Sequence, residues 1–428
     1  MSESSNDQRL EPGGIKLNSA VIINHQNQAI DVSQLVIQLM LYENMFAPFI
    51  TGELQISDAA ALTELLPFIG EEMLVLDIET PFPGDSPPEL FKRKAAFMIY
   101  KMSGRENVTQ KNVTYTLHFA SIEAFTDVNS KISQTFKGKI SDTVRKLIKA
   151  KPGLFSKKEV AIEPTANAEI HTSNFWSPTQ NIFYLTSRAV NAKNNPTYTF
   201  FENNEGFVFG SLDGLINAPK LQTFTKDQKT RQGNEAQSLE EEYGKVLDMS
   251  TPDYFDYFTR VQNGFYGSSL YHYDIQSKRL NFINRTDKDN WEGKHARLNP
   301  HTPYGKELQF LPEAALKTQV IHLNLFNNSP NLNVEHIPKR TALLAQVEAF
   351  KTNIRVYGRL DYTVGRVISL ICYTDTAISK SDTDEKIVDE MLSGNYLITA
   401  MSHEITREAH YCNIELCKDS FIQDLSKS

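Results

Sequence analysis

The residues whose chemistry is easiest to name lie near the C-terminus, where His403-Glu404 is followed by His410. A zinc protease uses two histidines four residues apart on one helical face, with a glutamate beside them. Here the histidines are seven residues apart, and the surrounding pattern is that of a strand, a turn and a second strand. We therefore expect no metal site at these residues.

Other signatures of catalysis or cofactor binding lack their defining residues. The lysines that follow a glycine are not followed by the serine or threonine with which a phosphate loop holds magnesium. Gly206, Gly210 and Gly214 surround a hairpin, which argues against a dinucleotide fingerprint, and no Gly-x-Ser-x-Gly elbow occurs. The sequence predicts no catalytic, cofactor-binding or metal-binding residue and no cofactor. A carboxylate pair for glycoside hydrolysis, distant in the chain, stays open.

Two aromatic clusters and three cysteines have structural explanations. Residues 254–258 (Tyr-Phe-Asp-Tyr-Phe) and Phe200-Phe201 could form a sugar platform, but such clusters are more often core or subunit interface. Cys412 and Cys417 lie five apart in a predicted strand, so they point to opposite faces. We interpret all three thiols as reduced and structural.

The elements that would position these residues are mostly β-strands. Apolar and polar residues alternate in eight segments, and this alternation predicts half-buried strands. The predicted strands are 50–57, 73–79, 95–102, 113–120, 354–359, 364–373, 396–404 and 410–418. The first four look like a barrel or sandwich of roughly 120 residues.

The middle of the chain has a different pattern. Ser177-Pro178 followed by Gln180 predicts a capped helix start, and the polar segment 220–244 predicts a linker or mobile loop. The other predicted elements are a helix at 141–150, a hairpin at 198–209, short strands at 265–273 and 279–283, and a helix near 338–350.

The composition is that of an ordinary folded protein, with 428 residues of which 22% are charged, 40% hydrophobic and 10% aromatic. This length predicts two or three domains. The net charge of −8 argues against a protein that coats nucleic acid with a basic face. No apolar run approaches the roughly 20 residues of a membrane span, and the polar N-terminus lacks a signal peptide's apolar core, so we expect folding in the cytoplasm.

The two β-rich ends of the chain resemble each other. Residues 97–103 (FMIYKMS) align with 396–402 (YLITAMS), and each run is followed by a polar turn and an alternating strand. Upstream, Gly52–Ile56 has a counterpart in Gly365–Ser369. Two interpretations are open: exposed hairpins that look alike by patterning alone, or a duplicated β-domain with α/β material between the copies. Three chains with two such domains each would place six barrels in a ring.

Residues 42–58 (YENMFAPFITGELQISD) resemble the early barrel of the baseplate central hub protein of contractile-tailed phages. The resemblance spans about residues 15–420 and is weakest between 220 and 338. Late control protein D and the hub domains of type VI secretion spikes share this hub fold. The further similar segments are 137–142, Ser177-Pro178, 198–203, Gly206-Phe207, 393–399 and Lys418-Asp419.

The resemblance implies a β-rich α+β fold, with two similar antiparallel β-barrel domains of the tail-tube type and an inserted α/β domain. The expected first barrel is 1–125 and the intermediate α/β region is 126–245. The second barrel is expected to be discontinuous, at 246–285 and 351–428, with 286–350 an insertion that packs with the intermediate region. The strands expected to form core and scaffold for the contact between barrels are those around Leu54, Met98, Leu117, Val367, Leu397 and Ile414.

The resemblance also implies a non-enzymatic function in the baseplate of the virion, after assembly in the host cytoplasm. The hub would be a homotrimeric, pseudo-sixfold ring that joins the trimeric cell-puncturing spike, as a separate polypeptide, to the hexameric tail tube or its initiator proteins. Baseplate wedge proteins would surround it, DNA would only pass through its channel, and no membrane insertion is expected. The excess of Asp and Glu would partly line that channel and repel phosphate, unless it serves solubility alone.

Two alternatives remain at this point. The chain could be the hub of a type VI-like contractile secretion machine, which its sequence barely separates from a phage hub. It could also belong to another class, the enzymes that degrade cell walls.

Overall fold

The structure is a computed structural model of the chain. It describes residues 11–60, 62–65, 68–81, 91–109, 112–227, 239–252, 255–286, 295–303, 316–321, 334–374 and 387–425. Among these residues, no helix combines the length and the apolar character needed to cross a lipid bilayer.

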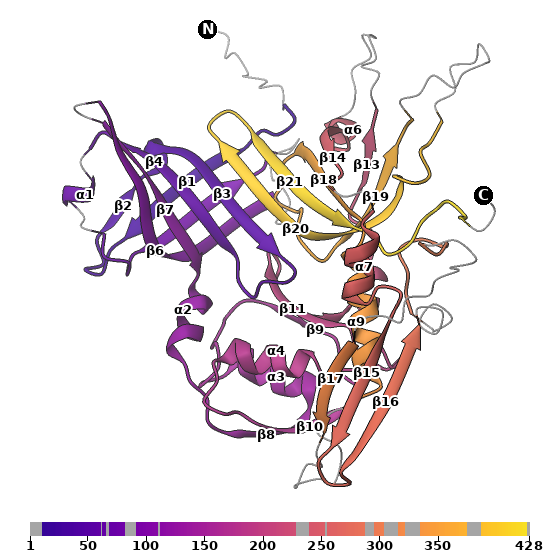
Figure 1. Cartoon of the computed structure of the whole chain (residues 1–428). Helices are drawn as coiled ribbons and strands as arrows, with labels where there is room; N and C mark the ends of the chain where they lie inside the picture. Colours follow the sequence, from indigo (N-terminus) through magenta and orange to yellow (C-terminus); the bar gives the residue numbers. More distant parts are fainter. Residues whose placement is uncertain are drawn as a thin grey trace, which may run out of the picture.

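The first β region is an antiparallel sheet with strand order β3-β4-β7-β6-β5-β1-β2 (Figure 1). Every second residue of β4 is buried, and Leu54, Ile56, Leu117 and Phe119 are core residues, as alternation predicts. The elements are β1 (Lys16–Ile23), β2 (Ala29–Asp31), a 3-10 turn at Ser33–Leu35, β3 (Val36–Asn44), β4 (Thr51–Asp58), α1 (Leu62–Leu65), β5 (Met73–Glu79), β6 (Lys92–Thr109) and β7 (Asn112–Ser121).

The α/β region follows and lies below the large sheet in Figure 1. Its core is one cluster that includes Val144, Leu147, Ile182 and Phe207. Ser177 forms the predicted capping box with Gln180 at the start of α4. The elements are α2 (Ile122–Asn129), β8 (Thr135–Lys139), α3 (Ile140–Lys149), β9 (Val160–Ile162), β10 (Ala168–Thr172), α4 (Pro178–Thr186), β11 (Tyr198–Asn203), β12 (Gly206–Ser211) and α5 (Leu212–Ile216).

The second β region contains the C-terminal strands and part of the segment that we expected to be a linker. That expectation is wrong for the described part of 220–244, because Phe224 is fully buried and its strand β13 pairs in parallel with β19. Residues 228–238 lie outside the described residues. The elements are β13 (Thr223–Lys226), α6 (Leu239–Tyr243), β14 (Val246–Ser250), β18 (Lys351–Tyr357), β19 (Val367–Cys372), β20 (Gly394–Thr406) and β21 (His410–Cys417).

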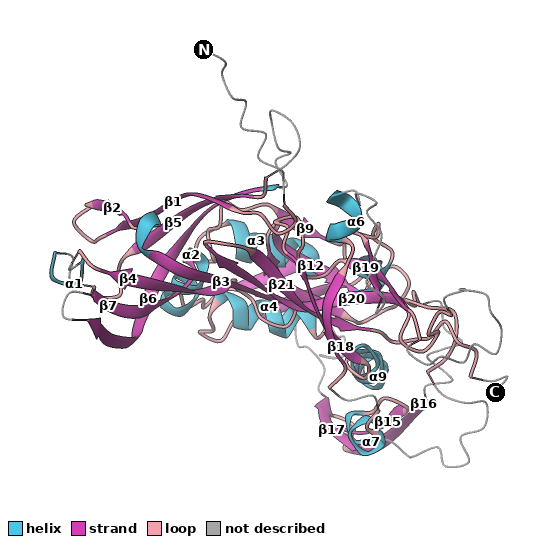
Figure 2. Cartoon of the chain, turned by 90° about the horizontal axis from the view of Figure 1, so that it is seen from above, coloured by secondary structure: helices cyan, strands magenta, loops and turns pink. Residues whose placement is uncertain are grey.

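A smaller three-stranded sheet stands apart from the large one (Figure 2). We assigned β15 and β16 to the second barrel, but they pair with β17 and not with the large sheet; the domain boundaries themselves stay a prediction. The helix expected near 338–350 begins two residues earlier. The elements are α7 (Tyr257–Asn263), β15 (Gly267–Asp274), β16 (Arg279–Thr286), β17 (Leu316–Ile321) and α9 (His336–Val347).

One strand joins the two β regions into a single 13-stranded sheet. The N-terminal part of β20 pairs with β19, whereas Ala400–Thr406 pairs with Asn44–Gln38 of β3. Figure 1 shows the yellow strand β20 directly beside the indigo strand β3. The two halves are therefore continuous through backbone hydrogen bonds.

The two β regions also have the same strand order. In the first region the order is β3-β4-β7-β6-β5-β1, and in the second it is β14-β18-β21-β20-β19-β13. The residue pairing matches as well, since Leu54 faces Leu117 and Ile354 faces Ile414 at equivalent places. One pair differs: β1 and β5 are antiparallel, whereas β13 and β19 are parallel.

The ladders are interrupted at the same positions. The pairing shifts between Val36 and Gln38 on β3, and between Val246 and Asp248 on β14. Patterning of apolar residues does not produce matched bulges, because a bulge depends on an extra residue at one place in the ladder. The duplication is therefore the better of the two interpretations.

The predicted alignment of the hairpins is correct, but the upstream alignment is wrong. Gly52–Ile56 lies on β4, whose counterpart is β18 and not Gly365–Ser369. The latter segment overlaps β19, which matches β5, since Val367 faces Leu397 as Met73 faces Met98. All half-buried strands alternate apolar and polar residues, so this pattern cannot show which strands are equivalent. Only the pairing of each strand with its neighbours shows it.

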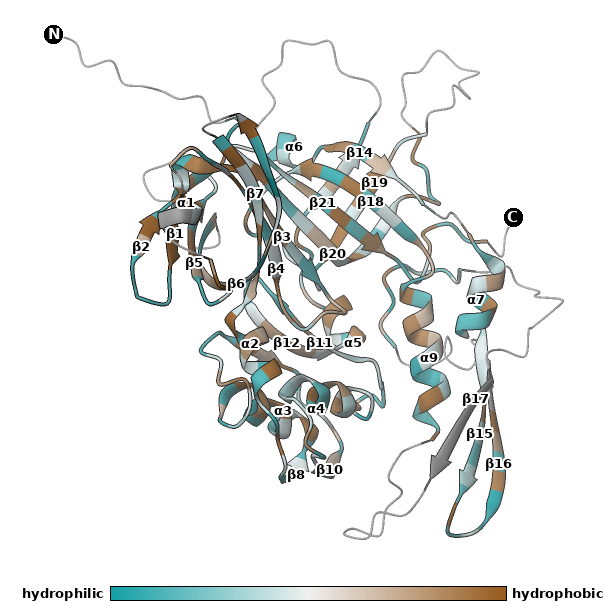
Figure 3. Cartoon of the chain, turned by 60° about the vertical axis from the view of Figure 1, so that its left-hand side comes forward, coloured by the Kyte–Doolittle hydropathy of each residue, from teal (hydrophilic) through white to brown (hydrophobic). Residues whose placement is uncertain are grey.

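The predicted β-rich α+β class is confirmed. Polar and apolar residues alternate along the strands of both β regions (Figure 3), and each region has its own buried core. In the second region, β13 and β14 are the first and last strands of the strand order. A parallel bridge between Thr225 and Lys245 connects β13 to the residue before β14, so this region is strongly curved. Closure of either region into a barrel stays a prediction.

Candidate functional site

A candidate functional surface is the polar face of the continuous sheet. Its central strands β18, β21, β20, β3, β4 and β7 bury alternate residues on one side, and the others form a face that crosses both halves of the chain. Its members are Gln38, Met40, Tyr42, Thr51, Glu53, Gln55, Thr116, His118, Arg355, Ser402, Glu404, Tyr411, Asn413 and Glu415.

Charges of both signs are paired on this face. Glu404 accepts from Arg355 of the same β region at 2.9 Å and from Gln38 of the first β region at 3.2 Å, and the second contact joins the two regions. Glu415 lies 3.7 Å from Lys351. Burial, with the nearby carboxylates Glu53 and Glu404, raises the pKa of Tyr42. The predicted acidic excess along a channel stays a prediction.

A row of three side chains on the same face has the atom order of a hydrolase triad. Ser103 Oγ lies 2.6 Å from His118 Nε2, and His118 Nδ1 lies 3.4 Å from Glu53 Oε1. The three residues come from neighbouring strands β6, β7 and β4, and none of them lines the 1140 Å³ cavity beside Lys92–Phe97 and Lys151–Glu159. A triad also needs oxyanion donors beside a bound acyl group. The row is therefore explained by cross-strand hydrogen bonding.

On the core side, a buried carboxylate joins the two halves. Glu43 on β3 accepts from Arg93 Nη1 on β6 at 3.2 Å, from Thr363 Oγ1 at 2.6 Å and from Val364 N at 3.3 Å. Both side chains of the ion pair are at most 6% exposed. An ion pair so placed fixes its neighbours, because separating the partners would leave a charge buried without compensation.

A second buried carboxylate joins the first β region to the α/β region. Glu202 accepts from the backbone N of Ile50 at 3.0 Å and from Lys158 Nζ at 2.5 Å, and Lys158 also donates to Glu123 at 2.7 Å. Burial raises the pKa of Glu202, and the Lys158 ammonium opposes that rise. Beside this joint lies a cavity of 1140 Å³, lined by Lys92–Phe97 and Lys151–Glu159 among other segments.

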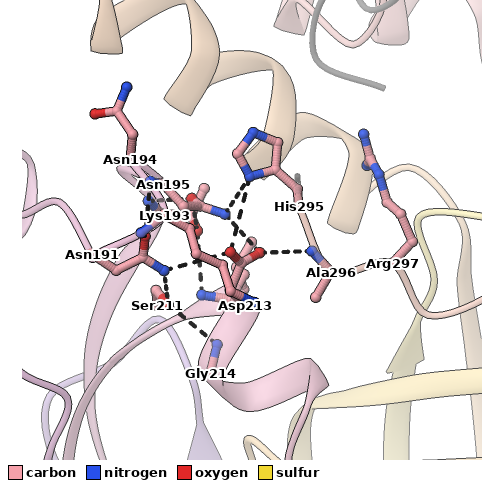
Figure 4. A network of polar contacts seen from close by, with 12 residues as sticks. Asn191, Lys193, Asn194, Asn195, Ser211, Asp213, Gly214, His295, Ala296 and Arg297 are labelled. Carbon is pink, nitrogen blue, oxygen red and sulfur yellow. Dashed lines mark hydrogen bonds and ion pairs between the residues drawn. The ribbon is translucent and has the colours of Figure 1, made fainter. Parts of the chain in front are cut away.

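A third polar cluster holds the start of α5 against residue 295 and its neighbours (Figure 4). The Asp213 carboxylate accepts from Asn195 Nδ2 at 2.8 Å and from the backbone N of Ala296 at 3.0 Å, and His295 Nδ1 lies 4.0 Å away. Burial alone would raise the pKa of Asp213, but the contacts with His295 and Ala296 hold it below its usual value. The cluster therefore ties the start of α5 to residues 195, 295 and 296.

The residues singled out in the sequence mostly fall in the core. The predicted scaffold positions Leu54, Leu117, Val367, Leu397 and Ile414 are buried, and Met98 is half-buried. The direct contact between the β regions is made by β20 with β3, and the sequence analysis missed β1, β2 and most of β3. A signal existed for β3: residues 36–42 (VIQLMLY) form a mostly apolar run of strand length with β-branched and aromatic members.

The aromatic clusters separate into two cases. Phe200 and Phe201 are core residues, as expected. Phe255 and Phe258 are 71% and 79% exposed, which excludes the core for these two, while Tyr254 lies outside the described residues. The three cysteines are free and buried, in agreement with the prediction of reduced, structural thiols.

The two histidines that we set aside lie on β20 and β21, in the predicted strand–turn–strand arrangement. From their seven-residue separation we expect no shared metal site. The hairpin instead returns His410 to within 3.0 Å of His403, measured between ring nitrogens.

No family model matches the sequence, and no curated protein matches it. Solved structures do match over nearly the whole chain. The tail protein from Neisseria meningitidis MC58 is 12% identical, with 95% of this chain and 97% of that chain covered and a TM-score of 0.55. The prophage MuSo2 43 kDa tail protein from Shewanella oneidensis is 10% identical, with 94% and 99% covered and a TM-score of 0.52.

A more distant likeness is the Escherichia coli c3393 protein, described as a component of the type VI secretion system, at 9% identity and a TM-score of 0.41. The two tail proteins are similar to this chain across all of its regions, including the duplicated strands and the α/β region between them. The chain therefore shares the fold of these two tail proteins.

Proposed function

We propose that the chain is a structural component of a contractile phage tail, a homotrimeric hub with pseudo-sixfold symmetry. The observation that carries the proposal is the duplication together with the way its copies are joined. Two similar modules in one chain become six in a trimer, and a ring of six can meet a sixfold tube on one side and a threefold spike on the other.

The contact inside the chain predicts the contact between chains. Within the chain, β3 of the first region pairs with the distal part of β20 of the second. The equivalent strands are β14 and the distal part of β6. Within the described residues, β6 beyond Met98 has no strand on the edge away from β7, and Asp248–Ser250 have none on the edge away from β18. We infer that these two edges pair between neighbouring chains.

The expected register follows from the equivalent positions. Glu404 faces Met40 inside the chain. Glu106 is the equivalent of Glu404, because Glu106 faces Thr114 on β7 and Glu404 faces Tyr411 at the equivalent position on β21. Ser250 is the equivalent of Met40, because Ser250 faces Asn353 on β18 and Met40 faces Glu53 at the equivalent position on β4. Glu106 of one chain should therefore lie opposite Ser250 of the next.

In such a ring the polar face of the sheet would line the lumen, and its apolar face would pack inside each module. The paired charges of that face suit a wall past which DNA moves, because few cationic groups are left free to hold phosphate. We propose no catalytic role. The spike, the tail tube and the wedge proteins are the proposed partners, and the virion tail is the proposed location.

The proposal is tested by native mass measurement of the full chain at micromolar concentration. The expected species is a trimer, visible in negatively stained images as a ring with six similar lobes. A monomer or dimer as the largest species, with or without a purified spike protein, would overturn the trimeric ring. A Ser103→Ala variant should assemble like the unchanged chain; loss of a hydrolase activity in that variant would favour an enzyme instead.

A further inference from the structure

Three side chains with metal-ligating atoms converge inside the second β region. They are His403 on β20 and His410 and Cys412 on β21, and His403 faces Cys412 across the ladder. His410 and Cys412 are two residues apart on one strand and share its core side. All three are fully buried, and one ligand atom from each lies within 4.8 Å of the others.

The distances between these atoms are within about 0.4 Å of those in a tetrahedral coordination shell. His403 Nδ1 lies 3.0 Å from His410 Nε2, and Cys412 Sγ lies 3.3 Å from the former and 3.7 Å from the latter. With metal–nitrogen bonds of about 2.1 Å and metal–sulfur bonds of about 2.3 Å, the edges of a tetrahedron are about 3.4 Å between nitrogens and about 3.6 Å between nitrogen and sulfur. The three atoms therefore lie near three corners of one tetrahedron.

The position of the His410 ring is tightly fixed. A Cβ atom placed on Gly358 would lie 2.3 Å from that ring, so the ring fits only because residue 358 has no side chain. The backbone N of Gly358 donates to the carbonyl of His410 at 2.8 Å. Packing of this kind holds a ligand in one orientation before a metal arrives, which favours binding.

The three ligand atoms already face one another inside the region, at 3.0–3.7 Å. An incoming divalent metal would take one lone pair from each imidazole and displace the thiol proton of Cys412 to solvent.

We propose that His403, His410 and Cys412 bind one transition-metal ion, with zinc as the expected occupant. Two imidazoles and a thiolate are a donor set that zinc accepts, and their softness disfavours magnesium and calcium. Among the described residues these three form the whole cluster, so they supply three of the four ligands of a tetrahedral ion. The ion would pin the β20–β21 hairpin, whose β20 also joins the two β regions.

The test is the metal content of the full chain, purified without a metal-affinity step and measured by mass spectrometry of the elements. The chain should hold about one zinc ion, retained on dialysis, since structural zinc binds tightly. Refolding with cobalt in place of zinc should give the visible absorption of a tetrahedral thiolate site. A chain that holds no metal, and takes up none when refolded with excess zinc or cobalt, would overturn the proposal and leave a hydrogen-bonded trio.

Matched variants identify the ligands. Cys412→Ser should lower the bound metal at least tenfold and abolish the cobalt–thiolate band. Cys417→Ser changes another buried cysteine of the same strand, whose Sγ contacts Thr399 instead, and should keep both. Equal loss in the two variants would overturn the assignment. Should Cys412→Ser not fold, His403→Gln and the cobalt spectrum of the unchanged chain still decide the matter.

Discussion

Ile99 on β6 and Ile398 on β20 are equivalent residues, each placed immediately before a bulge and facing Phe119 and Leu416 on the next strand. After each bulge the pairing resumes at Lys101 with His118 and at Ala400 with Glu415. The bulges on β3 and β14 match in the same way. Residues of these strands in one half therefore have equivalents in the other half, and a contact seen in only one half predicts the equivalent contact of the other.

The first prediction uses this template to trap the contact between chains. Glu106→Cys with Ser250→Cys should form a disulfide between neighbouring chains, because opposed residues on paired strands bring their Cβ atoms within disulfide range. The expected result under oxidation is a covalent ladder up to three chains on a non-reducing gel. Within one chain, β14 and β6 are seven strand steps apart along the sheet and lie in different halves of the molecule (Figure 1), so the expected bond is one between chains.

The matched control is Met40→Cys with Glu404→Cys, which face each other inside the chain. That pair should cross-link without a change in the number of chains. The native cysteines are buried and do not interfere. Monomers from the Glu106–Ser250 pair, in protein shown to be trimeric, would place the interface elsewhere.

The second prediction concerns the buried ion pair at the joint between the β regions. Arg93→Leu removes the cation from Glu43 and should lower the free energy of unfolding by about 3–5 kcal/mol, the usual effect of leaving one buried charge unpaired. Urea unfolding followed by circular dichroism measures it. The double variant Arg93→Leu with Glu43→Leu should recover at least half of the loss, and a double variant as unstable as the single one would contradict this explanation.

The third prediction concerns the close approach of β3, β4 and β7 at Gly52. A Cβ atom there would lie 2.3 Å from the Phe119 ring and 2.4 Å from the carbonyl oxygen of Met40. Gly52→Ala should therefore destabilise the chain by about 1–3 kcal/mol through overpacking. In Gly210→Ala the nearest atom would be Glu163 Oε2 at 3.7 Å, so thermal unfolding of this control should change far less.

The fourth prediction is a pH dependence caused by Lys418. Burial lowers the pKa of this lysine from 10.5 to about 7 in the folded chain, while its Nζ donates to the carbonyls of Met391 and Ser393. Between these two pKa values the unfolded chain holds the proton and the folded chain does not. Raising the pH through this window therefore stabilises the folded state, by at most about 1.4 kcal/mol per pH unit.

The variant Lys418→Gln keeps a hydrogen-bond donor but has no proton to release. The difference in unfolding free energy, unchanged chain minus variant, should thus increase from pH 7 to pH 9.5 and be flat from pH 5 to pH 6.5. Urea titrations at four pH values check it, and other titrating groups cancel in the difference. A difference that does not vary with pH would show that Lys418 stays protonated in the folded chain.

Much of the fold could be predicted because strand alternation and helix caps are local. The alternation around Leu54 and Leu117, and the cap at Ser177, each depend on residues within one turn or strand. Phe224 shows the limit: its strand lies in a polar segment and is held by a parallel ladder with β19, a partner more than a hundred residues away. No local pattern records such a partner.

The candidate sites were harder to predict for the same reason. Nothing in the sequence around Glu43 distinguishes it from an exposed carboxylate. Its partners Arg93 and Thr363 are distant in the chain and come close only in the fold. His403 and His410 were judged by the spacing rule for helices, under which a separation of seven rules out a shared ion. In a hairpin, side chains meet across the ladder, so the turn length decides which residues meet and the spacing rule does not apply.

The pairing of β20 with β3 over seven consecutive residues, Ala400–Thr406 with Asn44–Gln38, has a mechanical consequence. Two modules joined by a flexible tether would swivel and stretch before either carried a load. Modules joined by a backbone ladder deform together, so a force applied to one passes directly into the other. A hub of the proposed kind would therefore transmit the force of a contracting sheath as one rigid body, without a hinge inside the chain.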